Sequence, residues 1–390
     1  MKKVLAVLLM LCMVLSVANI NLIRANPFGP PNVMSIYIKS DGSIEPANSP
    51  IRNAGSNQYV LTDNLSPPSN SLYNSSMYNI VIEKDHISLD GANHTIDGLD
   101  YGVGIEILSR NNVTIKNIVL SQFETGIEVY QSSNVNIFDN SISANQFGIQ
   151  LSNSSNVVIA ENNFSNYSYQ TTIDMMSSNS TIIYGNNLSC TPVNGWLANG
   201  LRLEYCSNNY IVANTITNFY AGINLLNSSN NYFFQNNFVG NKIQAQDLLT
   251  LKSYQTINDN NKQFNERVPP KAQFYIYQFS TNAWNNNYWS DYNSTSNDNG
   301  VGELPYTIDA RNVDNSPLTQ KVTLEQAVPL NSIHSTIDMP ANAPLTANSP
   351  TSTPSPTPTV PEFPLLAIIP IMIGVLSLAV IIKIRSRKFD

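Results

Sequence analysis

The sequence predicts an all-β protein in which one short coil is repeated and stacked. Six segments between Gly104 and Phe238 share the pattern G-I-x-L-x-x-S-S-N-V-x-I-x-x-N-x-I, and most follow one another at about 22 residues, a period typical of solenoids. Apolar and polar residues alternate within each copy, as in strands that bury one face. Because such short strands cannot bury that face alone, the copies must stack around a common core.

Four positions of the repeat are apolar in every copy, and they form the expected core. The first two positions lie two residues apart, so both side chains face the same side of a strand. The columns are Ile105, Ile127, Ile149, Ile173, Leu201 and Ile223; Ile107, Val129, Leu151, Met175, Leu203 and Leu225; Ile115, Ile137, Ile159, Ile183, Ile211 and Phe233; and Leu120, Ile142, Phe164, Leu188, Ile216 and Phe238.

Two further positions hold Asn in most copies and are expected at corners, because Asn tolerates left-handed backbone geometry. Its amide can also bond to the same side chain on the next coil, so both columns predict structural ladders and not ligand sites. One column is Asn112, Asn134, Asn156, Asn208 and Asn230, with Ser180 in the fourth copy, and the other is Asn140, Asn162, Asn186, Asn214 and Asn236, with Ile118 in the first.

Three short strands and two Asn corners per coil resemble the right-handed parallel β-helix of the carbohydrate-binding and sugar-hydrolase type. The segments Ser35–Ile51 and Ile80–Ile96 resemble the entry cap and first coil of archaeal NosD-like proteins, whose family label is periplasmic copper-binding. Asn-x-x-Tyr-Trp-Ser-Asp-Tyr, followed by Gly-x-Gly-Glu-Leu-Pro-Tyr-Thr-Ile-Asp, resembles their exit segment. This resemblance implies a cap region over 26–79, repeats over 80–243 and an aromatic cap over 244–330.

Composition narrows the classes of partner. Asn makes up about one residue in seven, whereas charged residues are 12% and the formal net charge is -7. We do not expect nucleic acid as a partner, because clustered Lys and Arg are needed to neutralise phosphates and the repeats lack them. The many aliphatic residues also exclude a disordered chain.

The N-terminus predicts a secretory signal over residues 1–25. Lys2 and Lys3 precede an apolar run from Val4 to Val17, and Ala25 is a suitable cleavage position. A retained membrane anchor is the alternative, but the run is short for a membrane span.

The C-terminus predicts a stalk over 331–363 and a membrane anchor over 364–390. Pro alternates with Ser and Thr in the stalk, which favours a stiff, extended spacer. The apolar run Leu365–Ile382 is long enough to cross a bilayer, and the basic residues after it place the tip in the cytoplasm. A buried core helix is the alternative. Pro361-Glu362-Phe363-Pro364 resembles the archaeal PEF-type sorting signal, which implies a tail that is exchanged for a lipid anchor.

Two cysteines and two glycosylation motifs remain as candidate modification sites. Cys190 and Cys206 flank an insertion, so they either form a disulfide outside the cell or pack as two buried thiols. Asn-x-Ser/Thr motifs are frequent, and Asn74 and Asn293 are preferred as glycosylation sites because they lie outside the repeats.

The best catalytic candidate is an outward column on the first strand of each coil. Glu106 and Glu128 should lie side by side, because coils stack at about 4.8 Å. Adjacent carboxylates repel, which raises one pKa or recruits a cation. Arg202 could hold a substrate carboxylate, while a solvated face without chemistry is the alternative. The column consists of Glu106, Glu128, Gln150, Asp174, Arg202 and Asn224. Polysaccharide lyases, hydrolases and epimerases on β-helices carry acidic groups on a similar face.

Motifs for enzymes and metals are sparse. The chain has three His residues, none of which pairs with a nucleophile at a known motif spacing. Copper sites need clustered imidazole, thiolate or thioether ligands, so copper comes only from the family label. Calcium is the better candidate, because an oxygen-rich loop holds Asp291, Asp298, Asn299 and Glu303, although a polar loop without metal is the alternative.

The predicted function is a surface-anchored module that binds polysaccharide or a surface glycoprotein, or that serves a structural role. Tyr130, Tyr184 and Tyr220 are candidate stacking platforms for sugar rings. The alternative is a carbohydrate-active enzyme that uses Glu106, Glu128 and Asp174, and a third possibility is metal delivery.

Overall fold

The computed structural model describes residues 32–67, 76–167, 170–191, 198–248, 250–256, 273–278 and 281–333. The predicted signal (1–25), the sequon at Asn74, the stalk beyond residue 333, the PEF-type motif and the predicted anchor (364–390) lie outside these ranges. No helix in the described ranges is long and apolar enough to cross a membrane.

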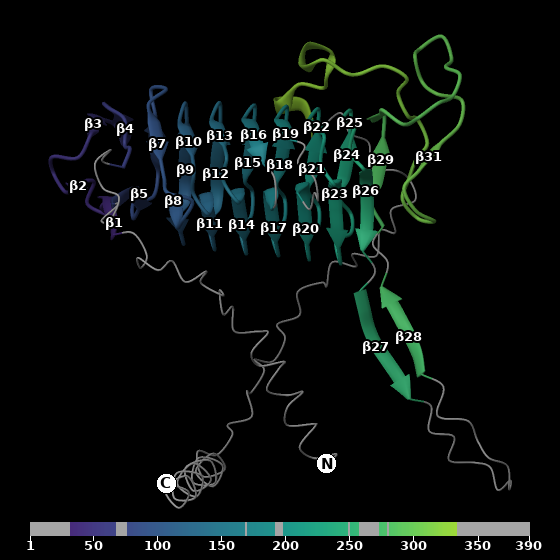
Figure 1. Cartoon of the computed structure of the whole chain (residues 1–390), viewed down its shortest axis with the longest axis horizontal. Coiled ribbons are helices and arrows are strands. Elements are labelled where there is room, and N and C mark those ends of the chain that lie inside the picture. Colours follow the sequence, from purple (N-terminus) through teal and green to yellow (C-terminus); the bar gives the residue numbers. More distant parts are fainter. Residues whose placement is uncertain are drawn as a thin grey trace, which may run out of the picture. The chain divides into compact units, whose positions relative to one another are not determined.

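The chain forms a parallel β-helix with three sheets, and a typical coil contributes one strand to each sheet (Figure 1). Sheet A contains β2 (Ile44–Glu45), β1 (Asn32–Ile38), β5 (Ser76–Ile82), β8 (Val103–Leu108), β11 (Thr125–Tyr130), β14 (Phe147–Ser152), β17 (Thr171–Met176), β20 (Asn199–Glu204), β23 (Ala221–Leu226) and β26 (Ile243–Leu248). Sheet B contains β3 (Ile51–Gly55), β4 (Gln58–Leu61), β6 (Ile87–Asp90), β9 (Asn111–Lys116), β12 (Ser133–Phe138), β15 (Val158–Ala160), β18 (Ile182–Tyr184), β21 (Tyr210–Val212), β24 (Tyr232–Phe234), β29 (Ala283–Asn285), β32 (Val313–Asp314) and β31 (Tyr306–Thr307). Sheet C contains β30 (Tyr288–Trp289), β25 (Asn237–Val239), β22 (Thr215–Thr217), β19 (Asn187–Cys190), β16 (Asn163–Tyr167), β13 (Ser141–Ser143), β10 (Val119–Ser121) and β7 (Thr95–Asp97).

The four predicted apolar columns line the interior of this helix. Ile127 pairs with Ile105 on one side and with Ile149 on the other, so each residue stacks on its counterpart one coil away. No member of the four columns is more than 1% exposed. The repeat and its core are therefore confirmed as a parallel β-solenoid.

The glycine that opens five of the six copies is explained by a close approach between coils. A Cβ atom on Gly126 would lie 2.6 Å from the carbonyl oxygen of Gly148, and one on Gly148 would lie 2.6 Å from that of Thr172. Neither distance is compatible with a side chain, so the stacking at these two coils requires glycine. The fourth copy has Thr172 at this position, where it is fully buried.

The Asn140 column forms a buried hydrogen-bond ladder at the corner between sheets B and C. Each side-chain Nδ2 donates to the Oδ1 of the next member at 2.9 or 3.0 Å, and the ladder continues beyond the predicted repeats to Asn287. Ile118, in the first copy, donates its backbone N–H to Asn140 Oδ1 at 3.0 Å. These amides satisfy the corner backbone, which otherwise lacks partners inside the protein.

The Asn112 column differs from its prediction, because it contains left-handed corners but no ladder. Its asparagines have φ values between 53° and 60° and are exposed. Within the described chain, no side-chain hydrogen bond joins one member to the next; Asn112 instead contacts His86, and Asn134 donates to Asn111. The buried bonds near this corner come from two other columns. One is a serine column that includes Ser132, Ser154, Ser178 and Ser228, and the other is an amide ladder from Asn209 through Asn231 to Asn282, one residue after the predicted column.

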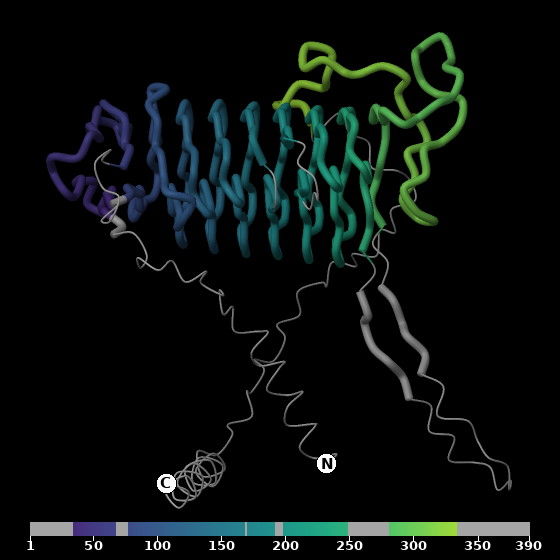
Figure 2. The backbone as a smooth tube through the Cα atoms, in the orientation of Figure 1, coloured from purple at the N-terminus to yellow at the C-terminus, as the bar shows by residue number. Residues whose placement is uncertain are grey.

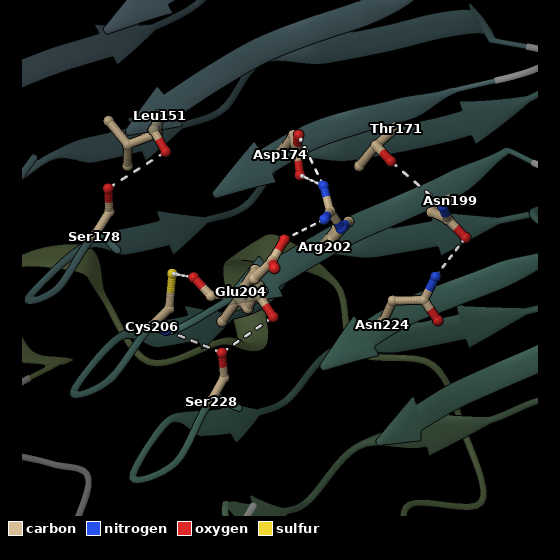
Figure 3. Close-up of polar contacts among 11 residues, drawn as sticks. Leu151, Thr171, Asp174, Ser178, Asn199, Arg202, Glu204, Cys206, Asn224 and Ser228 are labelled. Atoms are coloured by element: carbon tan, nitrogen blue, oxygen red, sulfur yellow. Dashed lines mark hydrogen bonds and ion pairs between the residues drawn. The ribbon is translucent and has the colours of Figure 1, made fainter. Parts of the chain in front are cut away.

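Cys206 takes the place of serine in the serine column, and of the two alternatives for the cysteines the structure has the two buried thiols. Its backbone N–H donates to Ser228 Oγ at 3.0 Å, and its thiol donates to the carbonyl oxygen of Glu204 (Figure 3). Cys190 ends β19 in sheet C and donates its thiol to the carbonyl oxygen of Tyr167. Both are free, buried thiols, and burial raises the pKa of each to about 11.

The helix extends beyond the predicted repeats at both ends. At the N-terminal end, β1 pairs in parallel with β5, β4 pairs in parallel with β6, and Leu65 bridges to Ile96, so a coil precedes Ile80. The predicted cap region 26–79 therefore contains a turn of the solenoid itself.

At the C-terminal end, aromatic rings close the core. Trp284 stacks on Phe233 with ring centroids 3.9 Å apart, and Trp289 stacks on Phe238 at 4.3 Å. Tyr306 then stacks on Trp289 at 4.2 Å. The rings continue the apolar columns and cover the end of the core, where edge pairing with another chain would otherwise be favoured. Between β26 and β29, β27 (Thr250–Thr256) and β28 (Gln273–Gln278) pair as an antiparallel hairpin.

Residues 319–333, which we call the strap, return along the helix and pack on the outside of sheet B. Figure 2 shows this segment in yellow. Val322 exchanges two hydrogen bonds with the side chain of Asn237, each 2.8 Å long. Ile333 is fully buried against Ala160, Tyr184 and Val212. The strap also contains two single-turn 3-10 helices, η1 (Leu324–Gln326) and η2 (Leu330–Ser332).

Candidate functional site on sheet A

The candidate site is the sheet A face, which we define as the outward side chains of strands β8 to β26. The predicted column follows the strand register without a break. Glu128 pairs with Glu106 and Gln150, Asp174 pairs with Gln150 and Arg202, and Asn224 continues from Arg202 to Gln246. The structure therefore brings all the predicted catalytic residues onto one face, although not into one cluster.

The N-terminal part of the face is acidic. Glu106 and Glu128 lie on neighbouring strands, and both side chains are half-buried. Burial raises the pKa of Glu106, while a hydrogen bond donated by Asn79 Nδ2 to Glu106 Oε1 at 2.8 Å opposes the shift. Burial also raises the pKa of Glu128, and the charge of Glu106 adds to the effect. The two carboxylates thus resist ionising together.

The middle of the face is an ion-pair network centred on Arg202 (Figure 3). Its Nη1 lies 3.1 and 3.3 Å from the two carboxylate oxygens of Asp174, and its Nη2 bonds to Glu204 Oε2. Burial raises the pKa of Asp174, whereas the charge of Arg202 lowers it. Asp174 is thus held in an ion pair about two coils from Glu128 and is not placed to act together with the acidic pair.

The C-terminal part of the face is a chain of neutral polar groups. Asn199 donates to Thr171 Oγ1 at 3.3 Å, Asn224 donates to Asn199 Oδ1 at 2.6 Å, and Gln246 donates to Asn224 Oδ1. A similar bond, from Thr125 Oγ1 to Gln150 Oε1 at 2.7 Å, lies nearer the acidic pair. Thr171 and Asn224 are buried, whereas Asn199 and Gln246 are half-buried. Because an amide has two N–H groups and a carbonyl oxygen, Asn199 and Gln246 keep unused capacity for a ligand.

A second outward column lies two residues further along each strand, and it is mostly apolar. It consists of Leu108, Tyr130, Ser152, Met176, Glu204, Leu226 and Leu248, so Ser152 and Glu204 interrupt it. It contains side chains that are unusually exposed for their type. Its most exposed members are Leu108 (38%), Tyr130 (38%), Met176 (44%) and Leu248 (42%). Polar groups beside a flat apolar strip are the combination that sugar rings need, because a ring presents hydroxyl edges and C–H faces.

The three predicted stacking tyrosines have different environments. Tyr130 lies on the sheet A face and is exposed, as required. Tyr184 was the wrong choice, because the strap covers it and leaves 5% exposed. Tyr220 is half-buried, and Lys242 Nζ lies 5.0 Å from its ring centroid.

The predicted calcium loop does not gather its ligands. Asp291 accepts hydrogen bonds from Tyr306 and Gln244, and Glu303 accepts one from Thr295 at 2.6 Å. Asn297, not a cation, organises the turn around Asn299 by accepting its backbone N–H. Nowhere in the described ranges do three His, Cys, Asp or Glu side chains lie close enough to share a metal. Asn293, the second predicted glycosylation site, is exposed in this loop.

Copper, which the NosD resemblance implies, does not fit the described residues either. The two thiols are buried on different corners and donate to backbone carbonyls. Met175 is in the core, while Met176 is exposed on sheet A. His86 contacts the Asn112 amide. The soft donors are therefore dispersed, and no copper site is assembled from them.

Two residues of the sheet A face, Glu204 and Gln246, and the neighbouring Asn79 on β5 were not among the predicted residues. Glu204 follows Arg202 by two residues, so strand alternation alone could have placed it on the same face. Gln246 lies beyond the last recognised copy but pairs with Asn224. Asn79 precedes the first copy, on β5, where no repeat pattern was evident, so its contact with Glu106 had no sequence signal.

Comparison with known proteins identifies the family. No curated protein matches the chain. Among solved structures, XylC with xylose is 10% identical, with a TM-score of 0.37 over 58% of this chain and 44% of that one. The periplasmic alginate epimerase AlgG is 12% identical, with a TM-score of 0.39 over 67% and 80%. An alginate lyase from Paenibacillus sp. str. FPU-7 is 11% identical, with a TM-score of 0.33 over 55% and 81%.

Likenesses this distant carry no information about activity, and the chain covers less than half of XylC. The sequence itself is more informative, since residues 34–294 match the family described as periplasmic copper-binding protein (NosD). That description agrees with the predicted location outside the cytoplasm. Because the match spans more than half of the chain, the protein belongs to the NosD family of parallel β-helix proteins.

Proposed function

We propose that the protein is a glycan-binding module and that the sheet A face is its binding surface. The observation that carries the proposal is the unbroken register of outward polar side chains from Glu106 to Gln246, beside a column of exposed apolar ones. A polymer lying along the helix would meet an outward polar side chain on every coil and an apolar one beside it on most of them. Its hydroxyl groups would bond to amides and carboxylates, and its ring faces would pack on Tyr130 and Met176.

A polysaccharide fits this face better than a folded protein partner does. Protein interfaces are distinguished by an apolar core with few charges. The sheet A face instead has carboxylates and amides along its middle and apolar groups to one side. A glycan-bearing surface protein offers the same chemistry as a free polysaccharide, so both remain within the proposal.

The test is a glycan array probed with the full chain, followed by titration of the polymers that bind. Tyr130→Ala should weaken binding about tenfold, because removing an aromatic platform costs about 1 kcal/mol or more. Asn136→Ala is the matched control, since Asn136 lies on the same coil but faces outward from sheet B. Binding that is unchanged in Tyr130→Ala, or lost equally in both variants, would exclude the sheet A face.

A carbohydrate-active enzyme is the second candidate, and the Glu106–Glu128 pair is the observation that favours it. A carboxyl group with a raised pKa can remain protonated and act as a general acid while its neighbour is ionised. Turnover by the wild type that disappears in Glu128→Gln, with glycan retention preserved, would establish an enzyme. Retention without turnover would establish the binding module.

We also propose that the module is displayed at a membrane through residues 364–390. The support is the apolar run Leu365–Ile382 with basic residues after it, preceded by the Pro-rich stalk. Fractionation of cells that express the full chain or a version ending at residue 363 tests this. Release of only the shortened chain into the soluble fraction is expected, and equal release of both would contradict an anchor.

A further inference from the structure

The charge of the sheet A face indicates which class of glycan it takes. On strands β8 to β23 of sheet A, four carboxylates face one guanidinium. The carboxylates are Glu106, Glu128, Asp174 and Glu204, and the guanidinium is that of Arg202. A ligand approaching this face therefore meets excess negative charge, which favours some polymers and rejects others before any contact forms.

Arg202 is already paired with two carboxylates of the protein. Its Nη1 bonds to Asp174 and its Nη2 to Glu204 (Figure 3). A uronate group that bound the remaining N–H groups of the guanidinium would lie beside both of these carboxylates, and one that took their place would leave a partly buried carboxylate unpaired. Either arrangement is costly, so this geometry does not favour the predicted role of Arg202 as a substrate clamp.

The acidic pair, Glu106 and Glu128, also disfavours the binding of a polyuronate. Glu106 and Glu128 are adjacent in register, and no basic side chain lies within 4.0 Å of either among the described residues. A polyuronate laid along the coils would add further carboxylates to this half-buried pair. Like charges brought together in this way cost affinity, and the cost decreases when salt screens them.

The rest of the face suits a neutral polymer. The amides of Gln150, Asn199, Asn224 and Gln246 each combine donors with an acceptor, as sugar hydroxyls do. Asn199, Asn224 and Gln246 are connected, because the buried Asn224 bonds to both of the others, while Gln150 bonds to Thr125 nearer the acidic pair. Such groups bind hydroxyls without requiring a counter-charge, so a neutral chain loses little when it leaves water.

We propose that the sheet A face binds neutral polysaccharides and excludes polyuronates. This inference rests on the proposed glycan-binding function and adds the substrate class. The difference between the two classes is one group, because oxidising the C6 alcohol of a hexose unit to a carboxylate converts a neutral polymer into a uronate polymer. The two polymers otherwise share linkage, length and ring geometry.

The experiment uses that matched pair with the full chain. A neutral polymer that binds on the array is oxidised at C6, and both forms are titrated with EDTA present so that no divalent cation bridges carboxylates. The neutral form should bind at least tenfold more tightly at low salt, and the ratio should fall as salt is added. The double variant Glu106→Gln/Glu128→Gln should lower this ratio of the affinities for the neutral and oxidised polymers. Glu161→Gln, at an exposed corner outside the face, should leave the ratio unchanged.

Each outcome separates the two proposals. An array on which only uronate polymers bind, or an oxidised form that binds as tightly as its parent, overturns the neutral-glycan inference and leaves glycan binding intact. An array with no bound polymer overturns the proposed function, and the inference is overturned with it. If the ratio of the two affinities is the same in the wild type and in Glu106→Gln/Glu128→Gln, the acidic pair does not determine which class of glycan binds.

Discussion

The outer faces of sheets A and B belong to the same coils but differ in what covers them. From Phe138 onward, the outward residues of sheet B are mostly apolar, and the strap buries Ala160, Tyr184 and Val212. On sheet A the outward column stays polar from Glu106 to Gln246, and no described segment is packed over it in this way. The apolar face is thus satisfied by the chain itself, whereas the polar face retains groups that a ligand can use.

The largest expected difference is in the free energy of unfolding, when a carboxylate is introduced on the outer face of sheet B or of sheet A. Ala160→Asp places a carboxylate beneath the strap and should lower the free energy of unfolding by about 3–5 kcal/mol, as for an unpaired buried charge. Ser152→Asp, on sheet A of the same coil, should change it by about 0.5 kcal/mol or less. Urea denaturation of both variants measures this. Similar losses in the two would mean that the faces are not distinguished by burial.

Removing a ladder amide should weaken the coils beneath both faces. Asn186→Ala removes the acceptor of the Asn162 backbone N–H and of one Asn162 Nδ2 hydrogen, as well as the side-chain donor to the carbonyl oxygen of Ile159. We expect a loss of about 3 kcal/mol, since each orphaned buried group costs about 1–3 kcal/mol. Asn156→Ala is the comparison from the exposed column and should cost about 1 kcal/mol for its left-handed backbone. A larger loss in Asn156→Ala would contradict the assignment of the two columns.

Shortening Ile333 should loosen the strap without affecting sheet A. Ile333→Ala removes buried apolar surface worth about 2 kcal/mol. Amide hydrogen exchange should become faster in β15, β18 and β21, where the strap packs, and stay unchanged in β14 and β17. Leu304→Ala, at a position that is 63% exposed, is the control. Faster exchange on both sheets would show that the strap stabilises the whole helix and not one face.

The smallest expected effect is the pH-dependent change in stability that the acidic pair causes. The pKa values of Glu106 and Glu128 are raised in the folded protein, so ionising them opposes folding as pH rises through the raised values. Glu106→Gln/Glu128→Gln should therefore have a higher Tm than the wild type at pH 7. The gain should vanish below about pH 4.3, where unfolded Glu is also protonated. A gain that grows as pH falls would reverse this sign, and Glu161→Gln should show no gain.

Much of the fold was predictable because the repeating sequence pattern indicates which residues face the core and how long each coil is. The four apolar columns have the period of the coil, and a period that survives in six copies has few structural solutions. The ends were less predictable, because the β1 coil and the Trp284 coil fill the same positions with different residues and spacings. Their membership depends on stacking with the neighbouring coil, which a comparison of repeat copies does not detect.

The site was predictable as a face but not as a set of contacts. Strand alternation correctly placed Glu106, Asp174 and Arg202 on one surface. It did not show that Glu204 would share Arg202 with Asp174, or that the strap would cover Tyr184. Both depend on contacts beyond the repeat: one on the rotamers of long side chains, and the other on a segment more than a hundred residues away in sequence. The Asn columns show the same limit, since both have Asn at one period but only one is buried.

Asp314 has a consequence for how proteins of this kind grow. Each amide at the corner between sheets B and C donates one N–H to a carbonyl oxygen of the preceding coil and another to the side chain of the next coil. The last, Asn287, donates to Phe233 and to Asp314 Oδ2 at 3.0 Å. A carboxyl group lacks the two N–H groups that bond to both neighbouring coils, so adding a coil after Asp314 would first require an amide in its place.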